Sequence, residues 1–235
     1  PSLLGAPELH SLSNLVGWAY FCAWSVSFYP QIMTNHARRS VVGLSLDYVA
    51  LNVLGYVCYS AYNLALFSSP DLRPPGGDLV RVNDVFFSLH ALVCCLVVAI
   101  QCCVFPRGEQ RVTLLVRVAL VLTTMGIAVY VVHAATRACP TGCTWIDLLF
   151  SVSCVKLAVT VAKYVPQVVL NNRRCSTVGW NIDNVVLDFT GGLLSTTQLL
   201  LDAGCTGGTL ISDPVKFGLG VLSMAFDSVF LYQHF

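Results

Sequence analysis

The sequence has few charged side chains. Asp, Glu, Lys and Arg make up 11% of its 235 residues, whereas hydrophobic residues make up 56%. A soluble domain carries roughly 25% charged residues, so this chain has too few charges to cover a soluble globule of its size. The net charge of +1 gives no electrostatic basis for binding nucleic acid. The composition therefore predicts a protein whose excess apolar surface faces a lipid membrane.

Several chemical signatures are also missing. We find no cleavable signal peptide, no zinc-binding pattern and no hydrolase or redox motif, so we expect neither an enzyme nor a bound metal or cofactor. Most of the 11 cysteines lie in apolar runs, where they act as small hydrophobic residues. Cys139 and Cys143 lie in a loop and could form a disulfide. The sequence begins with Pro1 and stops at Phe235, directly after an apolar segment. We therefore expect further sequence before and after it.

Long apolar segments are what the sequence does contain. A transmembrane helix needs about 20 mainly apolar residues, and charged or turn-rich stretches separate the segments that qualify. These segments are residues 13–34, 44–67, 84–105, 112–134, 145–170, 180–203 and 214–235. The sequence thus predicts an all-α membrane protein with seven transmembrane helices in a single domain, residues 1–235.

The distribution of arginine predicts the orientation of these helices. Cytosolic loops carry an excess of Lys and Arg, and the loops after the first, third and fifth segments have this excess. Their arginines are Arg38, Arg39, Arg107, Arg111, Arg173 and Arg174. We therefore expect a luminal or external N-terminus and a cytosolic C-terminus.

The chain contains an internal repeat. FYPQIMTNHARRSVVGLSLDYVALNVLG, which begins at Phe28, aligns without a gap with YVPQVVLNNRRCSTVGWNIDNVVLDFTG, which begins at Tyr164. The offset passes over an even number of segments, so both copies have the same orientation. We therefore expect two parallel three-helix repeats, residues 13–105 and 145–235, joined by a linker helix, residues 112–134. Transporters built in this way bind their substrate near the midplane, between the two halves.

Each repeat has a Pro-Gln pair deep in its leading helix. Proline removes an i→i−4 hydrogen bond and kinks the helix, and a cavity or a neighbouring helix can satisfy the freed carbonyl group. Pro30 and Pro166 occupy matched positions in the two repeats. Both therefore predict hinges for alternating access, although proline also bends many helices that do not act as hinges.

Ionisable residues lie where lipid is expected. Placing Lys or Asp at the bilayer centre costs about 2.5–3.5 kcal/mol on insertion scales, so such residues usually mark the path of an ion or a substrate. Lys156 and Lys163 are seven residues apart on one predicted helix face, and Asn171 follows eight residues later. Asn184 and Asp188, four residues apart, share a face of the sixth segment.

Asn52 is the repeat mate of Asp188, so the two halves offer polar side chains from equivalent positions. Together with the lysines, this pair can define one cavity. Snorkelling is the alternative explanation for Lys156 and Lys163, and helix capping is the alternative for Asp84. The proposed cavity is flanked by three aromatic residues, Trp24, Phe28 and Tyr164. Packing between helices is the alternative explanation for their presence.

These motifs resemble the PQ-loop superfamily, and most closely its lysosomal cystine carriers. The likeness is carried by SFYPQ, GLSLDYVALN, KLAVTVAKYVPQ, GWNIDNVVLDFTGG, DPVKFGLGV and FDSVFLYQHF. It extends over nearly every segment and is weakest in residues 68–82 and in the fourth segment. The resemblance implies the 3+1+3 fold shared with SWEET sugar transporters. It also implies a proton-coupled symporter that exports L-cystine from the lysosome or vacuole to the cytosol.

The resemblance further implies which residues are functional. Asp84, Asp188 and Asp227 would carry protons, and Lys216 would be a further functionally sensitive residue. The substrate-binding residues would be Asn52, Lys156, Lys163, Tyr164, Asn184, Asp188, Trp24, Phe28, Gln31, Gln167 and Asn171.

The chemistry of cystine suits these residues. Its two carboxylates can pair with Lys156 and Lys163, and an ionised Asp188 can accept an ammonium group. Protonation of Asp188 in an acidic lumen would remove a buried charge and so ease the exchange between open states.

Other functions remain open. A SWEET-type sugar uniporter has the same plan, but a sugar pocket does not need two lysines and an aspartate. A carrier of cationic amino acids would place these lysines against a substrate of like charge. A seven-helix receptor for retinal or for a peptide signal is the alternative outside transport.

Overall fold

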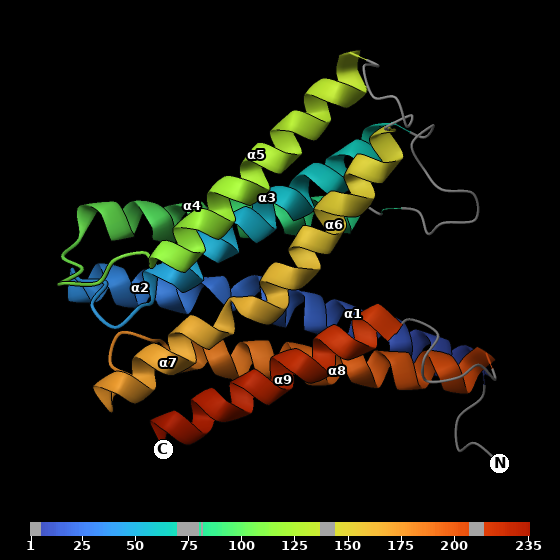
Figure 1. The fold of residues 1–235 in the computed structure, drawn as a ribbon. Helices are drawn as coiled ribbons and strands as arrows, with labels where there is room; N and C mark the ends of the chain where they lie inside the picture. The colour runs from blue at the N-terminus through green and yellow to red at the C-terminus, as the bar shows by residue number, and fades with distance from the viewer. Residues whose placement is uncertain (1–5, 70–79, 81, 137–143, 207–213) are drawn as a thin grey trace. The chain divides into compact units, whose positions relative to one another are not determined.

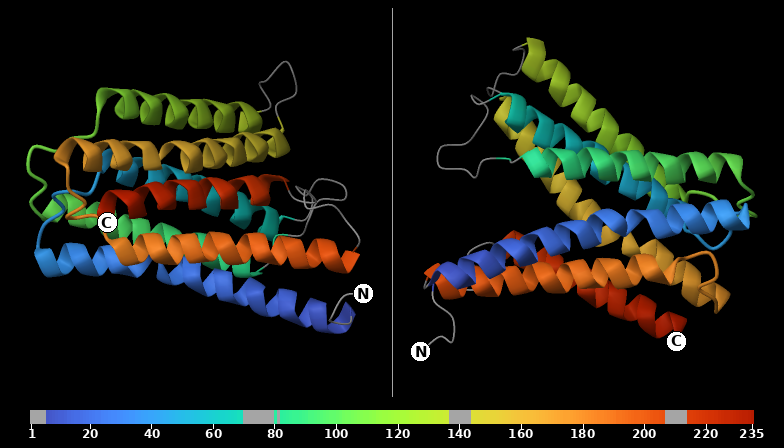
Figure 2. Two further views of the ribbon diagram at one scale, coloured as in Figure 1. Left: turned by 90° about the horizontal axis from the view of Figure 1, so that it is seen from below. Right: turned by 180° about the vertical axis from the view of Figure 1, so that it is seen from behind.

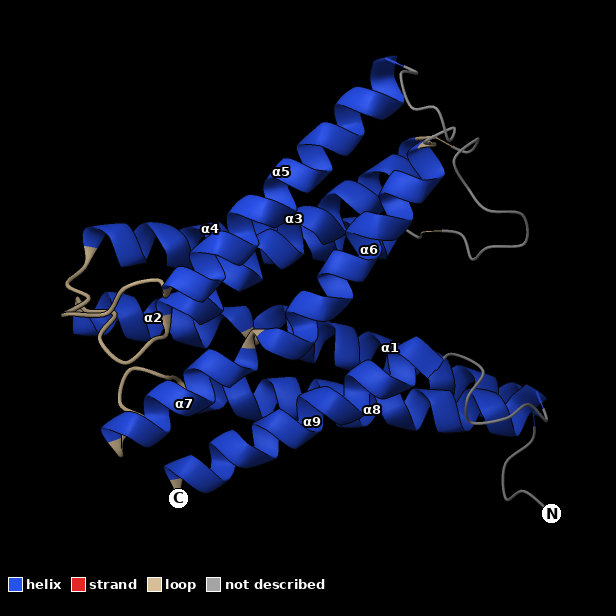
Figure 3. Ribbon diagram, viewed as in Figure 1, coloured by secondary structure: helices blue, strands red, loops and turns tan. Residues whose placement is uncertain are grey.

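The computed structural model of the chain describes residues 6–69, 80, 82–136, 144–206 and 214–235 (Figure 1). These residues are helical apart from short loops, and no strand occurs among them (Figure 3). The helices are α1 (Ala6–Val26), α2 (Phe28–Arg38), α3 (Leu46–Ser68), α4 (Val82–Val104), α5 (Leu114–Thr136), α6 (Trp145–Ala162), α7 (Tyr164–Arg174), α8 (Ile182–Thr206) and α9 (Pro214–His234). One residue separates α1 from α2, and one separates α6 from α7. We call each of these two pairs a broken rod. When each broken rod is counted as one helix, the described residues form seven helices, which confirms the predicted seven-helix, all-α fold.

Among the described residues, four helices are long and apolar enough to cross a membrane. They span Leu46–Ser68, Asp84–Val104, Leu114–Thr136 and Trp145–Arg174. Most large apolar side chains of α5 are exposed, including Leu115, which is 80% exposed. Such a surface is expected of a helix that faces lipid. Membrane crossing by α1–α2, α8 and α9 stays a prediction from the sequence.

The two broken rods are interrupted at matched residues, Ser27 and Lys163. Each interruption precedes the proline of its repeat by three residues. Pro30 and Pro166 have no N–H group to donate to the carbonyl four residues earlier, which weakens the helix at this point. Both prolines thus interrupt their helices as the sequence predicts, and their action as hinges stays a prediction.

The turn after each broken rod has the same conformation in both repeats. Arg39 and its repeat mate Cys175 have φ angles of 48° and 45°, and Gly43 and its mate Gly179 have φ angles of 102° and 107°. This agreement at left-handed positions confirms the internal repeat. A side chain at either glycine would be strained.

The helices group into two compact units. The first unit comprises residues 1–37 and 171–235, and the second comprises residues 38–170. In the first unit, α1 lies along α8, and α8 packs against α9 (Figure 2). In the second unit, α3 packs against α4 and α6, and α5 contacts α3 and α6. Each unit therefore combines the leading helix of one expected repeat with later helices of the other.

Candidate functional site

Lys163 is held in the second unit by an amide and two aromatic rings. It is 7% exposed and occupies the break between α6 and α7. Its Nζ donates to Oδ1 of Asn52 on α3 at 3.2 Å. The same atom lies 4.6 Å from the ring centroid of Tyr164 and 5.8 Å from that of Tyr48. Ring faces at these distances attract an ammonium group. The structure thus brings Lys163, Asn52 and Tyr164 together.

Lys156 lies two turns earlier on α6 and also contacts aromatic rings of α3. Its Nζ is 4.1 Å from the ring centroid of Tyr56 and 5.5 Å from that of Tyr59. We name Lys156, Lys163, Asn52, Tyr48 and Tyr56 the lysine cluster.

Sequence reasoning missed the two tyrosines of the lysine cluster. Their spacing contained the signal, because Tyr48, Asn52 and Tyr56 recur every four residues and so share one face of α3. Asn52 is fixed from its other side, where its Nδ2 donates to Sγ of Cys95 on α4 at 3.1 Å.

A second group of side chains lies in the first unit, on α8 and α9. Oγ of Ser223 is 3.2 Å from Oδ2 of Asp188 and 3.4 Å from Oδ2 of Asp227. Asp227 is only 1% exposed. We name Asp188, Ser223 and Asp227 the carboxylate cluster. One hydroxyl group, with a single hydrogen, thus lies between two carboxyl groups. The family resemblance assigned proton transfer to both aspartates, together with Asp84, but nothing in the sequence singled out Ser223, which precedes Asp227 by four residues, about one helical turn.

Trp24 fixes the backbone beside the carboxylate cluster. Its Nε1 donates to the carbonyl oxygen of Asp188 at 3.2 Å. A Cβ atom added to Gly191 would lie 2.4 Å from the Trp24 ring, so the absent side chain allows α1 and α8 to approach here. Gly55, the repeat mate of Gly191, is equally constrained, because a Cβ there would lie 2.8 Å from Cγ1 of Val159. Trp24 and Asp188 therefore lie together.

The two PQ glutamines hold the matched turns. In the first unit, Nε2 of Gln31 donates to the carbonyl of Gly179, and the backbone N–H of Asn181 donates to Oε1 of Gln31, both at 2.9 Å. In the second unit, Nε2 of Gln167 donates to the carbonyl of Gly43 at 2.9 Å, and the backbone N–H of Ser45 donates to Oε1 of Gln167 at 2.7 Å. Each glutamine therefore uses both ends of its amide on the backbone of the opposite repeat. The sequence did not reveal this role, because the partners come from a distant segment.

The remaining predicted residues lie on several helices. Asn171 is buried and donates to Oε1 of Gln233 at 3.1 Å. Asn184 lies one turn before Asp188 on α8, and its side chain is half-buried. Phe28 begins α2, and Asp84 lies in the first turn of α4.

Two predictions fall on parts of the chain that the structure does not describe. Lys216 lies near the start of α9, but its side chain is outside the described residues. The predicted Cys139–Cys143 disulfide also lies outside them.

The chain is similar to known proteins over most of its length. The PQ loop repeat family matches residues 12–72 and 148–204. Cystinosin of Bos taurus is 48% identical over 233 residues, which cover 95% of this chain and 62% of that protein. A cystinosin homolog of Dictyostelium discoideum is 37% identical, covering 97% of this chain and 81% of that protein. The cystine transporter of Saccharomyces cerevisiae is 27% identical, covering 96% and 94%.

The fold is also that of a solved transporter. A eukaryotic SWEET transporter superposes with a TM-score of 0.50 and 14% identity, covering 94% of this chain and 98% of that one. At this identity the likeness concerns the fold alone. The chain spans about three fifths of the length of the bovine relative. On the repeat match and the identities to cystinosins, the chain belongs to the cystinosin family of PQ-loop repeat proteins.

Proposed function

We propose that the chain is the membrane part of a proton-coupled carrier that exports L-cystine from a lysosome or vacuole to the cytosol. The observation that carries the proposal is the lysine cluster, in which two cations are placed among aromatic rings inside a membrane helix bundle. Placing such cations inside a membrane costs several kcal/mol, and they usually mark the path of a substrate or an ion. The name of the yeast relative supports cystine as the substrate.

In this proposal the lysine cluster binds the carboxylates of cystine. Lys156 and Lys163 are seven residues apart, or about 10 Å along the helix axis. Two cations spaced in this way suit a substrate with a carboxylate at each end. The tyrosine rings hold the ammonium groups in place without neutralising them, so both groups keep the charge that attracts a carboxylate.

The carboxylate cluster is proposed to carry the proton. Two ionised carboxylates next to one hydroxyl repel each other, and only one of them can accept the hydroxyl hydrogen at a time. A single proton held between Asp188 and Asp227 removes both problems. The cluster would take up this proton in the acidic lumen and release it in the cytosol. Asp84 is proposed as a further proton carrier, as the family resemblance implies.

The two helix breaks are proposed to act as hinges. Lys163 is itself the break residue, so a carboxylate bound to its Nζ would act directly on the joint between α6 and α7. Pro166→Ala restores an N–H group that can donate to the carbonyl of Ala162 and so should stiffen the joint. We expect slower cystine exchange with unchanged cystine affinity, measured by counterflow and equilibrium binding. Unchanged exchange would exclude a hinge at this position.

The substrate assignment is tested by counterflow of radiolabelled cystine in proteoliposomes. We expect unlabelled cystine, but not lysine, arginine or glucose, to drive exchange. Lys163→Met should reduce cystine exchange to background, because it keeps most of the length of the side chain but removes the cation. Arg173→Gln, which removes an exposed charge from α7, serves as the matched control.

Three results of this experiment would contradict the proposal. One is cystine exchange by Lys163→Met at the wild-type rate. Exchange driven by glucose would favour a SWEET-type sugar carrier, and exchange driven by lysine or arginine would favour a cationic amino acid carrier.

A further inference from the structure

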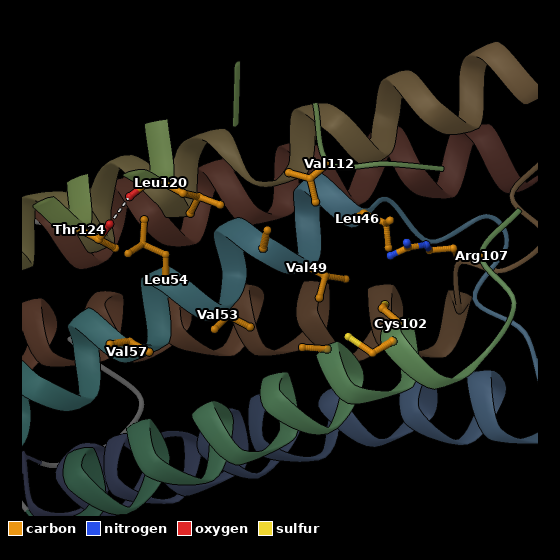
Figure 4. Close-up of a pocket in the computed structure, with 13 residues that line it drawn as sticks. Leu46, Val49, Val53, Leu54, Val57, Cys102, Arg107, Val112, Leu120 and Thr124 are labelled. Atoms are coloured by element: carbon orange, nitrogen blue, oxygen red, sulfur yellow. Dashed lines mark hydrogen bonds between the residues drawn. The ribbon is translucent and has the colours of Figure 1, made fainter. Parts of the chain in front are cut away.

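A groove in the second unit takes no part in the proposed transport. It lies between α3, α4 and α5 and has a volume of about 500 Å³ (Figure 4). Ligand pockets usually measure about 300–1,000 Å³. Apart from Arg107 and Thr124, its lining side chains are apolar. Thr124 donates its hydroxyl hydrogen to the carbonyl of Leu120 at 2.8 Å, so it requires no polar ligand.

The groove remains open because α5 packs against its neighbours over a small area. Val116 of α5 joins Leu51 of α3 and Val159 of α6 in a buried apolar cluster. Elsewhere α5 leaves most of its side chains exposed. Small side chains, Ala50 on α3 and Ala99 on α4, line the groove and leave room for a ligand. In a membrane, an apolar groove of this kind faces hydrocarbon and not water.

The length of the groove matches one leaflet of a bilayer. Along α3 it extends from Leu46 to Val57, which corresponds to about 16 Å at 1.5 Å per residue. The hydrocarbon core is about 30 Å thick, so the groove covers about half of it. Arg107 lies at the Leu46 end of the groove (Figure 4), and the positive-inside rule assigns this end to the cytosol.

The Arg107 end of the groove is basic. Arg107 is exposed and follows α4, and Arg111 lies four residues later in the same loop. The guanidinium group of Arg39 lies 6.0 Å from the ring centroid of Phe105, which brings a third cation to this junction. Two acids also lie at this end, Glu109 of the loop and Asp47 of α3, whose Oδ1 accepts from the Thr113 backbone N–H at 2.7 Å, so the three arginines outnumber them.

We propose that the groove binds one acyl chain of an anionic glycerophospholipid of the cytosolic leaflet, with the phosphate of the head group on Arg107. The apolar walls and the length of one leaflet fit the acyl chain. The guanidinium group can bind phosphate oxygens in a bidentate manner. Basic sites between transmembrane helices on the cytosolic side commonly bind acidic head groups.

The test uses the purified protein in detergent mixed with equal amounts of phosphatidylserine and phosphatidylcholine, and native mass spectrometry counts the lipids that it retains. We expect the wild type to retain phosphatidylserine in preference, because its head group carries a net negative charge, whereas the choline cation offsets the phosphate charge in phosphatidylcholine. Arg107→Gln should lower phosphatidylserine retention about ten-fold, the effect of losing one charge-assisted contact. Val53→Phe fills the groove and should lower retention of both lipids. Arg173→Gln, an exposed arginine of the first unit, is the control.

Several outcomes would overturn the lipid site. These are equal retention of both lipids by the wild type, unchanged phosphatidylserine retention by Arg107→Gln, and an equal loss in the Arg173→Gln control. A second copy of the chain retained in place of lipid would also overturn it. If circular dichroism shows that Val53→Phe does not fold, Arg107→Gln decides alone, because this exposed side chain makes no contribution to the core.

Discussion

Single side chains decide how each cluster holds its charge. Lys163 has an amide oxygen and two phenol rings around its ammonium group, whereas Lys156 has two rings. These neighbours stabilise a cation while leaving its charge available to a carboxylate. In the carboxylate cluster, the single hydroxyl hydrogen of Ser223 can be donated to either Asp188 or Asp227.

Ser223→Ala removes the hydroxyl that links Asp188 to Asp227. We expect cystine transport by this variant to lose most of its stimulation by a pH gradient, because a proton could no longer pass between the two carboxyl groups through Oγ. Ser223→Thr keeps the hydroxyl and should keep the stimulation, which makes it the matched control. The measurement is the initial rate of cystine uptake into proteoliposomes at a series of external pH values. An Ala variant with the wild-type pH profile would show that Ser223 only packs between α8 and α9.

The residues that sequence reasoning identified and those that it missed differ in where their partners lie. Lys156, Lys163 and Asp188 were predictable because a charge in an apolar segment is conspicuous by itself. Ser223 was not, because serine is common in membrane helices and its importance depends on which carboxyl groups lie opposite. The role of Gln31 in holding a distant turn depended in the same way on a partner in another segment.

At the scale of helices, apolar length predicted the elements closely. The segments expected at 44–67, 84–105 and 112–134 became Leu46–Ser68, Val82–Val104 and Leu114–Thr136. Turn-rich or charged residues flank these segments on both sides, so the sequence indicated where each helix begins and ends. What the sequence did not indicate is which helices pack together. The pairing of α1 with α8, and of α3 with α6, depends on close approaches that only the folded structure reveals.

Gly191 tests one of these approaches. A Cβ atom at this position would lie 2.4 Å from the Trp24 ring, and moving the ring breaks its bond to the Asp188 carbonyl. Gly191→Ala should therefore lower the free energy of unfolding by about 1–3 kcal/mol. Gly126→Ala is the control, since nothing lies within 4 Å of the added atom. It should raise this free energy by roughly 0.5–1 kcal/mol, the helix preference of Ala over Gly.

Thermal unfolding in detergent, followed by circular dichroism, compares the two variants. If Gly191→Ala is as stable as Gly126→Ala, the packing of α1 on α8 is looser than the structure indicates.

At the scale of the whole molecule, the repeat explains why two different clusters occur in one fold. The turns and glutamine bonds are alike in both copies, whereas the chemistry at matched positions differs. Ser27 in one copy corresponds to Lys163 in the other, and Asn52 corresponds to Asp188. We propose that this divergence gives one unit the cations that bind substrate carboxylates, and the other the acids that carry the proton.

Cystine accumulation driven by a pH gradient tests this division of roles most directly. Proteoliposomes with an acidic exterior and a neutral interior should concentrate radiolabelled cystine when they contain the wild-type chain. Asp188→Asn should abolish this accumulation, because the amide cannot take up and release a proton under these conditions. The account predicts gradient-driven cystine uptake by the wild type and none by Asp188→Asn. Wild-type accumulation by Asp188→Asn, or no response of the wild type to the gradient, would contradict it.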